Sequence, residues 1–241
     1  MSGSRSLSSP IAPLELMRGY DAMAIFEGLR LPVVAAPMFL ISGPDLVVAA
    51  CKSGIVGSFP APNCRTVADL DCWMGKISDQ LAGLDAAPWA VNLVTHSTNA
   101  RLADDLRLVV EYKPAVVITA LGSPVPAIET VKAYGGTVIA DVVNIRLAEK
   151  AVAAGADGLA CISAGAGGHT GFMSPFAFIS AVRDFFDGIV TIGGGITDGA
   201  GVAGAVAAGA DLVYMGTRFL ATEENAQRHC NFHPRTSERA A

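Results

Sequence analysis

The chain has 241 residues, of which 51% are hydrophobic and only 16% are charged, and its formal net charge is -5. No basic stripe appears along the sequence, so nucleic-acid binding is not expected. Glycine, proline and charged residues interrupt every apolar stretch before it reaches the roughly 18 residues that a membrane-spanning helix needs. Short apolar runs of this kind are typical of parallel strands buried beneath helices.

The five cysteines are odd in number and form no Cys-x-x-Cys pair. This usage is typical of free thiols in a reducing compartment, so we expect a cytoplasmic protein without a metal site. We expect three segments. Residues 1–30 would form a Ser-rich leader and capping segment, 31–226 the main domain, and 227–241 an atypical polar tail.

Eight short apolar runs alternate with segments that can form helices. Two of these runs follow the same heptapeptide, because Ala151–Asp157 recurs as Ala205–Asp211. Alanine favours helix, and Gly155 and Gly209 can end each helix in a left-handed conformation before a strand begins. The expected strands are Pro32–Met38, Ile55–Phe59, Trp89–Val94, Ala115–Leu121, Gly136–Val142, Gly158–Ser163, Gly188–Gly193 and Leu212–Gly216. Strands that alternate with helices indicate a parallel α/β fold, and eight units favour a closed (β/α)₈ TIM barrel.

Helix starts are expected at Ser42 before Pro44, at the capping-box-like pair Thr66 and Asp69, and at Ser174 before Pro175. The C-terminal part of the barrel looks truncated, since no amphipathic period follows Ala226. We therefore expect at most a short helix around 221–228. The outer faces of the first and last strands should then be partly bare, and self-association is left open.

Two glycine-containing loops follow the seventh and eighth expected strands, as Gly193–Gly195 and Gly216–Thr217. Backbone N–H groups in glycine turns can hold a phosphate, and TIM barrels frequently build their phosphate site from these two loops. We therefore predict a phosphate site there. The alternative is that the glycines only allow tight turns.

The segment Ala164–Gly171 follows the sixth expected strand and contains His169 among four glycines. Chemistry in a TIM barrel lies on the loops after the carboxyl ends of the strands. A neutral imidazole there can donate or accept a proton near neutral pH, so His169 is a candidate catalytic residue. The alternative is a structural histidine that only binds loop backbone.

Four motifs in this order resemble the nitronate monooxygenases, formerly called 2-nitropropane dioxygenases. They are Ala35–Met38, Gly165–Gly171, Gly194–Ile196 and Met215–Phe219. The resemblance covers residues 31 to 224. It implies an FMN-dependent barrel that oxidises alkyl nitronates or nitroalkanes with molecular oxygen. FMN is expected instead of FAD, because no Gly-x-Gly-x-x-Gly run follows an early strand to hold a pyrophosphate.

The resemblance also implies roles for individual residues. His169 would lie near the reactive flavin N5, where it would bind a nitronate oxygen or take the α-proton of a nitroalkane. The cofactor-binding positions would be Ala36, Pro37 and Met38 along the flavin ring, Asn92 facing the cofactor, Gly167 approaching the ring, and Gly194, Gly195, Gly216 and Thr217 at the phosphate.

The fifth strand shows a departure from the family. Some members carry a lysine at its end, where this chain has Asp141. An ionised carboxylate cannot donate a hydrogen bond to the flavin, so Asp141 is expected to bind a flavin hydroxyl or another polar group. The alternative is a solvated aspartate at the end of a strand.

Two other functions remain open at this point. The first is an FMN-dependent NAD(P)H reductase that acts on a quinone or an enoyl thioester, since related barrels share the glycine loops and the histidine. The second is a truncated, inactive flavin-binding barrel.

Overall fold

The computed structural model describes residues 22–225, and within them eight parallel strands form a closed barrel in the order β1 to β8. Their bounds are β1 Val33–Ala35, β2 Val56–Pro60, β3 Trp89–Val94, β4 Val116–Ala120, β5 Thr137–Val142, β6 Gly158–Ile162, β7 Ile189–Gly193 and β8 Leu212–Met215. Each expected strand is therefore confirmed to within a few residues. The fold is a (β/α)₈ TIM barrel, as the alternation of strand and helix signals predicted.

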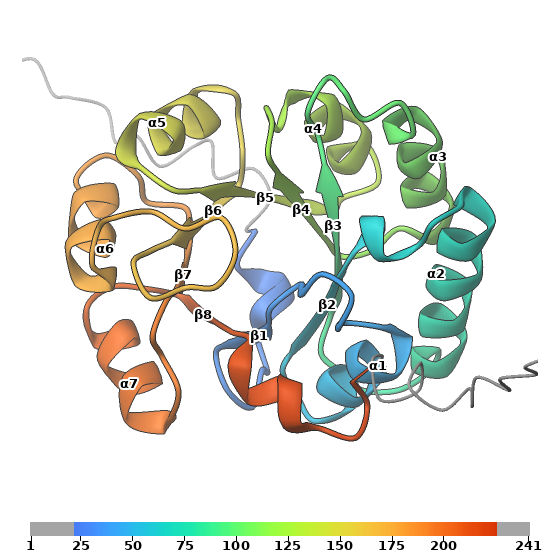
Figure 1. Cartoon of the computed structure of the whole chain (residues 1–241), viewed down its shortest axis with the longest axis horizontal. Coiled ribbons are helices and arrows are strands. Elements are labelled where there is room, and N and C mark those ends of the chain that lie inside the picture. The colour runs from blue at the N-terminus through green and yellow to red at the C-terminus, as the bar shows by residue number, and fades with distance from the viewer. Residues whose placement is uncertain (1–21, 226–241) are drawn as a thin grey trace, which may run out of the picture.

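Seven α-helices surround the strands in Figure 1, one after each strand from β1 to β7. They are α1 Pro44–Lys52, α2 Val67–Leu81, α3 Leu102–Tyr112, α4 Val125–Lys132, α5 Ile145–Ala153, α6 Pro175–Arg183 and α7 Gly199–Ala207. Three short 3-10 helices complete the described chain: η1 Ala24–Phe26, η2 Ala61–Asn63 and η3 Thr217–Ala221. In Figure 1, η3 lies between α7 and α1.

The barrel closes because β1 pairs with β8, with Val33 opposite Val213 and Ala35 opposite Met215. Alternate residues of each strand point inward and pack as one cluster, with Val34, Ala90 and Ile139 among them. Phe26 of η1 belongs to the same cluster and is 7% exposed. Since η1 precedes β1, it fills the end of the barrel where the strands begin, and the opposite end carries the loops after the strands.

The repeated heptapeptide has a structural role that its sequence did not reveal. Gly155 and Gly209 adopt φ of 93° and 109°, which confirms the left-handed helix ends. The aspartate that follows each glycine accepts a backbone N–H from the preceding strand of the sheet. Val138 of β5 donates to Asp157 Oδ2 over 3.0 Å, and Val190 of β7 donates to Asp211 Oδ2 over 2.7 Å.

The helix starts agree with expectation at two places and differ at one. Thr66 and Asp69 form a full capping box, and the Ser174 side chain accepts from the N–H of Ala177. Ser42 does not cap α1, because Gly43 occupies the N-cap position. The Ser42 hydroxyl is bound instead within the preceding loop.

The region after β8 differs in part from expectation. The described chain forms η3 and then runs without helix to residue 225, so the remainder of the helix expected around 221–228 lies outside the described residues. The outer faces of the first and last strands are not bare, because Val33 and Val213 are 4% and 0% exposed. Among residues 22–225, no helix has the length and apolar character needed to cross a membrane.

The packing of Phe26 generates a prediction. Phe26→Ala should lower the free energy of unfolding by about 3–5 kcal/mol, because it leaves a cavity at the closed end of the barrel. Phe39→Ala serves as the control, since the Phe39 side chain is 63% exposed. Urea denaturation measures both variants. Equal effects of the two substitutions would show that η1 does not fill the barrel interior.

Candidate active site

The loops after the strands lie at one end of the barrel, which we call the open end. Two polar side chains hold the segment after β1 in place there. The Ser42 hydroxyl donates to the carbonyl of Ala36 and accepts from the N–H of Met38. The Asn63 amide donates to the carbonyls of Met38 and Ser42 over 3.1 and 2.8 Å. Asn63 Oδ1 also accepts from the N–H of Leu40, whose φ is 63°. Ala36, Pro37 and Met38 are therefore fixed in position, as a surface against which a ligand rests requires.

Sequence reasoning did not identify Asn63 as part of this site. It lies in η2 at the end of β2, and a polar residue at that end of a barrel strand was the available signal.

The glycine loops after β7 and β8 have the conformations that a close approach of backbone requires. Gly194 and Gly195 adopt φ of 140° and 69°, and a Cβ on Gly194 would lie 2.2 Å from the Ser163 hydroxyl. A Cβ on Gly195 would meet nothing within 4 Å, so this residue borders open space. The N–H of Gly195 is already bound to the carbonyl of Gly165 over 3.2 Å. It is therefore not the free donor that the sequence suggested.

The loop after β8 keeps its donors free. Within residues 22–225, the N–H groups of Gly216 and Thr217 have no protein acceptor. Gly216 has φ of -108°, which any residue can adopt, so the backbone conformation does not require glycine at this position. A Cβ there would instead lie 3.4 Å from the Met38 sulfur. The loops after β1 and β8 are therefore neighbours at the open end of the barrel.

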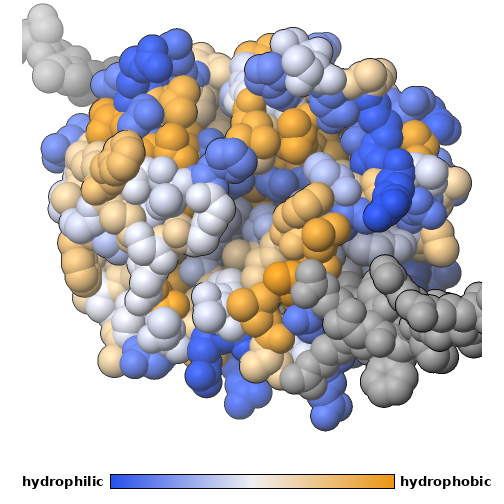
Figure 2. Space-filling model, viewed as in Figure 1, coloured by the Kyte–Doolittle hydropathy of each residue, from blue (hydrophilic) through white to orange (hydrophobic). Residues whose placement is uncertain are grey.

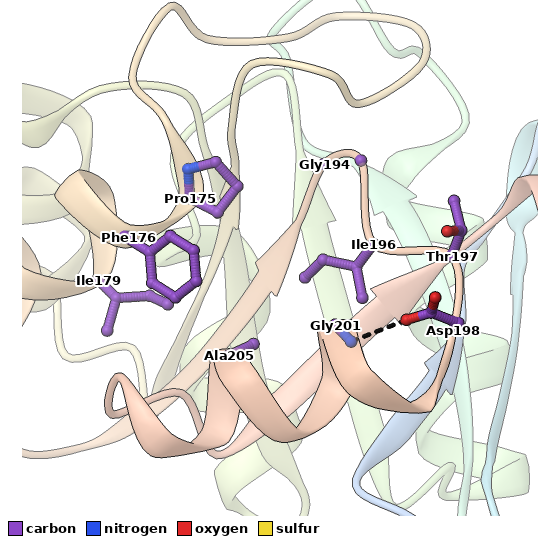
Figure 3. A pocket seen from close by; sticks show the side chains of 10 residues that line it. Pro175, Phe176, Ile179, Gly194, Ile196, Thr197, Asp198, Gly201 and Ala205 are labelled. Carbon is purple, nitrogen blue, oxygen red and sulfur yellow. Dashed lines mark hydrogen bonds between the residues drawn. The ribbon is translucent and has the colours of Figure 1, made fainter.

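A cavity of about 320 Å³ lies on the outer side of the glycine loop. Figure 3 shows its walls, with Phe176 and Ile179 from α6 on one side and Ile196 and Ala205 on the other. Asp198 caps α7 beside it by accepting the N–H of Gly201 over 2.8 Å. The cavity lies between α6 and α7, and Gly194 and Gly195 of the candidate phosphate loop line it on the side of β7.

His169 lies on the loop between β6 and α6, and its side chain is exposed. The loop is anchored where it leaves and rejoins the barrel. The Thr170 hydroxyl donates to the carbonyl of Ser163 over 2.5 Å, and the N–H of Gly171 donates to Ile162 over 3.0 Å. A Cβ on Gly171 would lie 2.3 Å from the carbonyl of Val143, so only glycine fits there.

The part of this loop before His169 is open. A Cβ on Gly167 would meet nothing within 4 Å, which leaves room for a flat ligand. His169 itself makes no hydrogen bond or ion pair within residues 22–225. No contact within these residues therefore supports the alternative, in which His169 is a structural histidine that binds loop backbone. The structure places His169 on the expected loop but does not bring its ring into contact with the other candidate residues.

A polar pair lies inside the barrel near the open end. Asn92 of β3 is buried, and its amide donates to Asp141 Oδ2 of β5 over 3.4 Å. The whole Asp141 side chain is half-buried, but its Oδ1 is shielded from solvent and has no hydrogen-bond partner. Asp141 is therefore not a freely solvated aspartate.

Burial raises the pKa of the Asp141 carboxyl to about 7, although the hydrogen bond from Asn92 lowers it. The reason is that a charged carboxylate is poorly stabilised away from water. Close to neutral pH, a large share of the molecules carry Asp141 as a neutral acid. An ionised Asp141, as expected from the sequence, could only accept hydrogen bonds, whereas the neutral acid can also donate one.

Apolar side chains border the open end. Phe39 and Leu40 follow β1, Leu121 follows β4 and Phe172 follows β6, and all four are more than half exposed. Figure 2 shows apolar surface near the middle of the face that carries these loops. The candidate site thus combines an apolar rim with glycine loops and a buried polar pair, a composition typical of small-molecule sites.

Known proteins share this barrel. The family model for nitronate monooxygenase matches residues 85–233. A nitronate monooxygenase of Paraburkholderia phytofirmans is 30% identical over 86% of this chain and 68% of its own length. A (3aS,4S,5R,7aS)-5-hydroxy-7a-methyl-1-oxo-octahydro-1H-indene-4-carboxyl-CoA dehydrogenase of Rhodococcus jostii is 32% identical over 85% of this chain and 56% of its own length. The chain thus spans between about half and two thirds of these relatives.

Solved structures agree. FabK from Thermotoga maritima superposes with a TM-score of 0.75 at 28% identity, over 86% of this chain and 64% of that chain. The nitroalkane oxidase from Streptomyces ansochromogenes superposes with a TM-score of 0.76 over 84% of this chain and 70% of that chain, and at 23% identity it supports the fold alone. The fold is a (β/α)₈ TIM barrel with glycine loops after β7 and β8. Within that class, the chain belongs to the nitronate monooxygenase family, which confirms the resemblance seen in its motifs.

The buried carboxyl of Asp141 generates a prediction about stability. Its folded-state pKa, about 7, lies above the ordinary value of 3.8, so the folded state holds the proton more tightly than the unfolded state. The stability of the free protein should therefore fall as pH rises from about 4 to about 7. Asp141→Asn should remove this contribution and stabilise the protein at pH 8 by up to about 4 kcal/mol, because one pKa unit corresponds to about 1.4 kcal/mol.

Denaturation at several pH values tests this. The exposed Asp79 of α2 provides the control variant Asp79→Asn. If the difference between Asp141→Asn and wild type stayed constant from pH 4 to pH 8, the carboxyl would not titrate as described.

Proposed function

We propose that this chain binds FMN at the open end of the barrel and acts as an oxidoreductase that oxidises alkyl nitronates or nitroalkanes with molecular oxygen. The observation that carries the proposal is the meeting of open glycine loops, after β7 and β8, with a buried polar pair at the same end of the barrel. Family membership supplies the reaction class, and the whole protein's activity is part of the proposal.

The residues present fit FMN. Gly216 and Thr217 offer two unpartnered N–H groups for a phosphate, and Gly195 borders open space beside them. Gly167 leaves room for a flat ring, and the unpartnered Oδ1 of Asp141 offers a polar contact. When bound, FMN supplies the electron-transfer chemistry that amino-acid side chains lack. No pyrophosphate fingerprint follows an early strand, which favours FMN over FAD.

His169 has the role of holding the substrate or moving its proton. Its imidazole donates a hydrogen bond to a nitronate oxygen, or accepts the α-proton of a neutral nitroalkane at a ring nitrogen. Two observations support this role. The side chain has no partner within residues 22–225, and the anchors at Thr170 and Gly171 fix the C-terminal side of its loop. Ala36, Pro37 and Met38 would form one wall of the flavin site, and Asn92 would face the cofactor.

A second candidate is an FMN-dependent NAD(P)H reductase acting on a quinone or an enoyl thioester. The likeness to the CoA-ester dehydrogenase of Rhodococcus jostii favours it, because that relative is named for a thioester substrate. Consumption of NADH without oxygen separates the two candidates. Steady anaerobic consumption supports the reductase, whereas nitronate-dependent oxygen uptake without NADH supports the oxidase.

The role of His169 is testable. His169→Asn should leave FMN bound but slow nitronate or nitroalkane oxidation by roughly 10²–10⁴-fold, the usual contribution of a general acid or base. Oxygen uptake measures turnover, and flavin fluorescence measures binding. His96→Asn is the control, because His96 lies on another loop and contacts Thr98. If His169→Asn turned over substrate at the wild-type rate, His169 would have only a structural role.

The glycine loop is testable with a matched control. Gly195→Val should weaken FMN binding by about tenfold or more, equal to ~1.4 kcal/mol, because a branched side chain would fill the open space. Gly83→Val is the control, since Gly83 follows α2 and has φ of 71° with nothing within 4 Å. Both variants place valine at a positive φ, so both should lose similar stability. Equal FMN affinity in the two variants would show that the loop after β7 does not contribute to the FMN site.

A further inference from the structure

Three polar side chains from three strands point into the barrel. Asn92, Asp141 and Tyr214 each lie two residues after an inward-facing apolar residue of their strand, namely Ala90, Ile139 and Leu212. Since side chains in a strand alternate between its two faces, all three share the interior with that apolar cluster. By the same alternation the buried Thr137 and Thr191 also face the interior, but among the inward-facing groups only Asp141 carries a carboxyl and only Tyr214 a phenol within residues 22–225.

Two atoms of this polar cluster lack any partner. Asp141 Oδ1 and the Tyr214 hydroxyl are both shielded from solvent, and neither forms a hydrogen bond. Buried polar groups are nearly always paired, and an exception calls for a ligand or another explanation. Asn92 satisfies only the other carboxyl oxygen of Asp141. The cluster therefore has unused hydrogen-bonding capacity on two neighbouring side chains.

The charge surrounding Asp141 favours its neutral form. Within residues 22–225 it forms no ion pair, and β3 contributes only the neutral amide of Asn92. The titratable groups near it are Tyr214 on β8 and Cys161 on β6. Burial raises the pKa of the Cys161 thiol to about 12, and burial raises that of the Tyr214 phenol well above its ordinary value. Both are therefore neutral and cannot stabilise a carboxylate as cations would.

We propose that Asp141 binds the flavin ring as a neutral carboxylic acid, donating a hydrogen bond to an acceptor atom of the ring, with Tyr214 as a second neutral donor. This inference rests on the proposed binding of FMN. It assigns to an acidic residue the donor function that a cationic side chain would otherwise serve. No covalent bond changes, and the proton stays on Asp141.

Such a hydrogen bond couples binding to pH. The bond exists only when Asp141 is protonated, so the complex holds that proton more tightly than the free protein does. At pH 8 most free molecules carry the ionised carboxylate and must take up a proton when the flavin binds. Affinity should therefore fall as pH rises above about 7, by up to tenfold for each pH unit. If the ionised carboxylate accepted a bond from the ring instead, binding would release protons below pH 7.

Titration calorimetry of the flavin-free protein with FMN at pH 8 tests the proposal, in two buffers that differ in their enthalpy of protonation. The wild type should take up about one more proton per FMN than Asp141→Asn, whose amide carries a donor at every pH. Asp79→Asn should match the wild type. Riboflavin, which lacks the phosphate, should give the same difference, and this excludes the phosphate as the source of the proton.

The outcomes are separable. Equal proton uptake by wild type and Asp141→Asn, or net proton release by the wild type relative to that variant, overturns the inference while FMN binding stands. Failure of wild type to bind FMN overturns the proposed function and the inference with it. Should Asp141→Asn fail to fold, the pH dependence of riboflavin affinity in the wild type decides the matter. An affinity that is constant from pH 6 to pH 9 overturns the inference. Tyr214→Phe should weaken riboflavin binding at every pH.

Discussion

The pairing of β1 with β8 is the constraint on which the candidate site depends. It joins two strands that are about 180 residues apart in the chain and continues past their ends, where Ala36 donates to the carbonyl of Met215 over 3.0 Å. Because of this closure, Met38 lies against Gly216, and the first and last loops border one site. An open sheet of the same strands would separate these two loops to opposite edges.

The two ends of the barrel have different roles. The end where the strands begin is filled by η1 and the apolar cluster, while the other end carries the glycine loops and the polar residues. Ser42 and Asn63 fix the wall after β1, and the Ser163 hydroxyl donates to the carbonyl of Gly193 over 2.7 Å. These contacts preorganise the loops without occupying the donors of Gly216 and Thr217. Preorganised loops on a rigid barrel are what a cofactor site requires.

The sequence predicted the strands and the positions of the loops between them well, because both depend on local signals. The repeat around Gly155 and Gly209 marked helix ends, and the glycines of residues 193–195 marked a loop after a strand. Features that depend on tertiary contacts were not predictable. The bonds from Asn63 to the loop after β1 join residues more than 20 positions apart, and Ser42 was mistaken for a helix cap. The shielding of Asp141 was also missed, since its sequence position alone is equally compatible with a solvated strand end.

The proposed site at the open end of this barrel would hold one FMN. The most direct measurement is to purify the full chain, record its absorbance, and identify and quantify any extracted cofactor by mass. We expect a yellow protein that contains FMN, or a colourless protein that binds one equivalent of added FMN. Extraction of FAD, or no binding at saturating FMN, would contradict it.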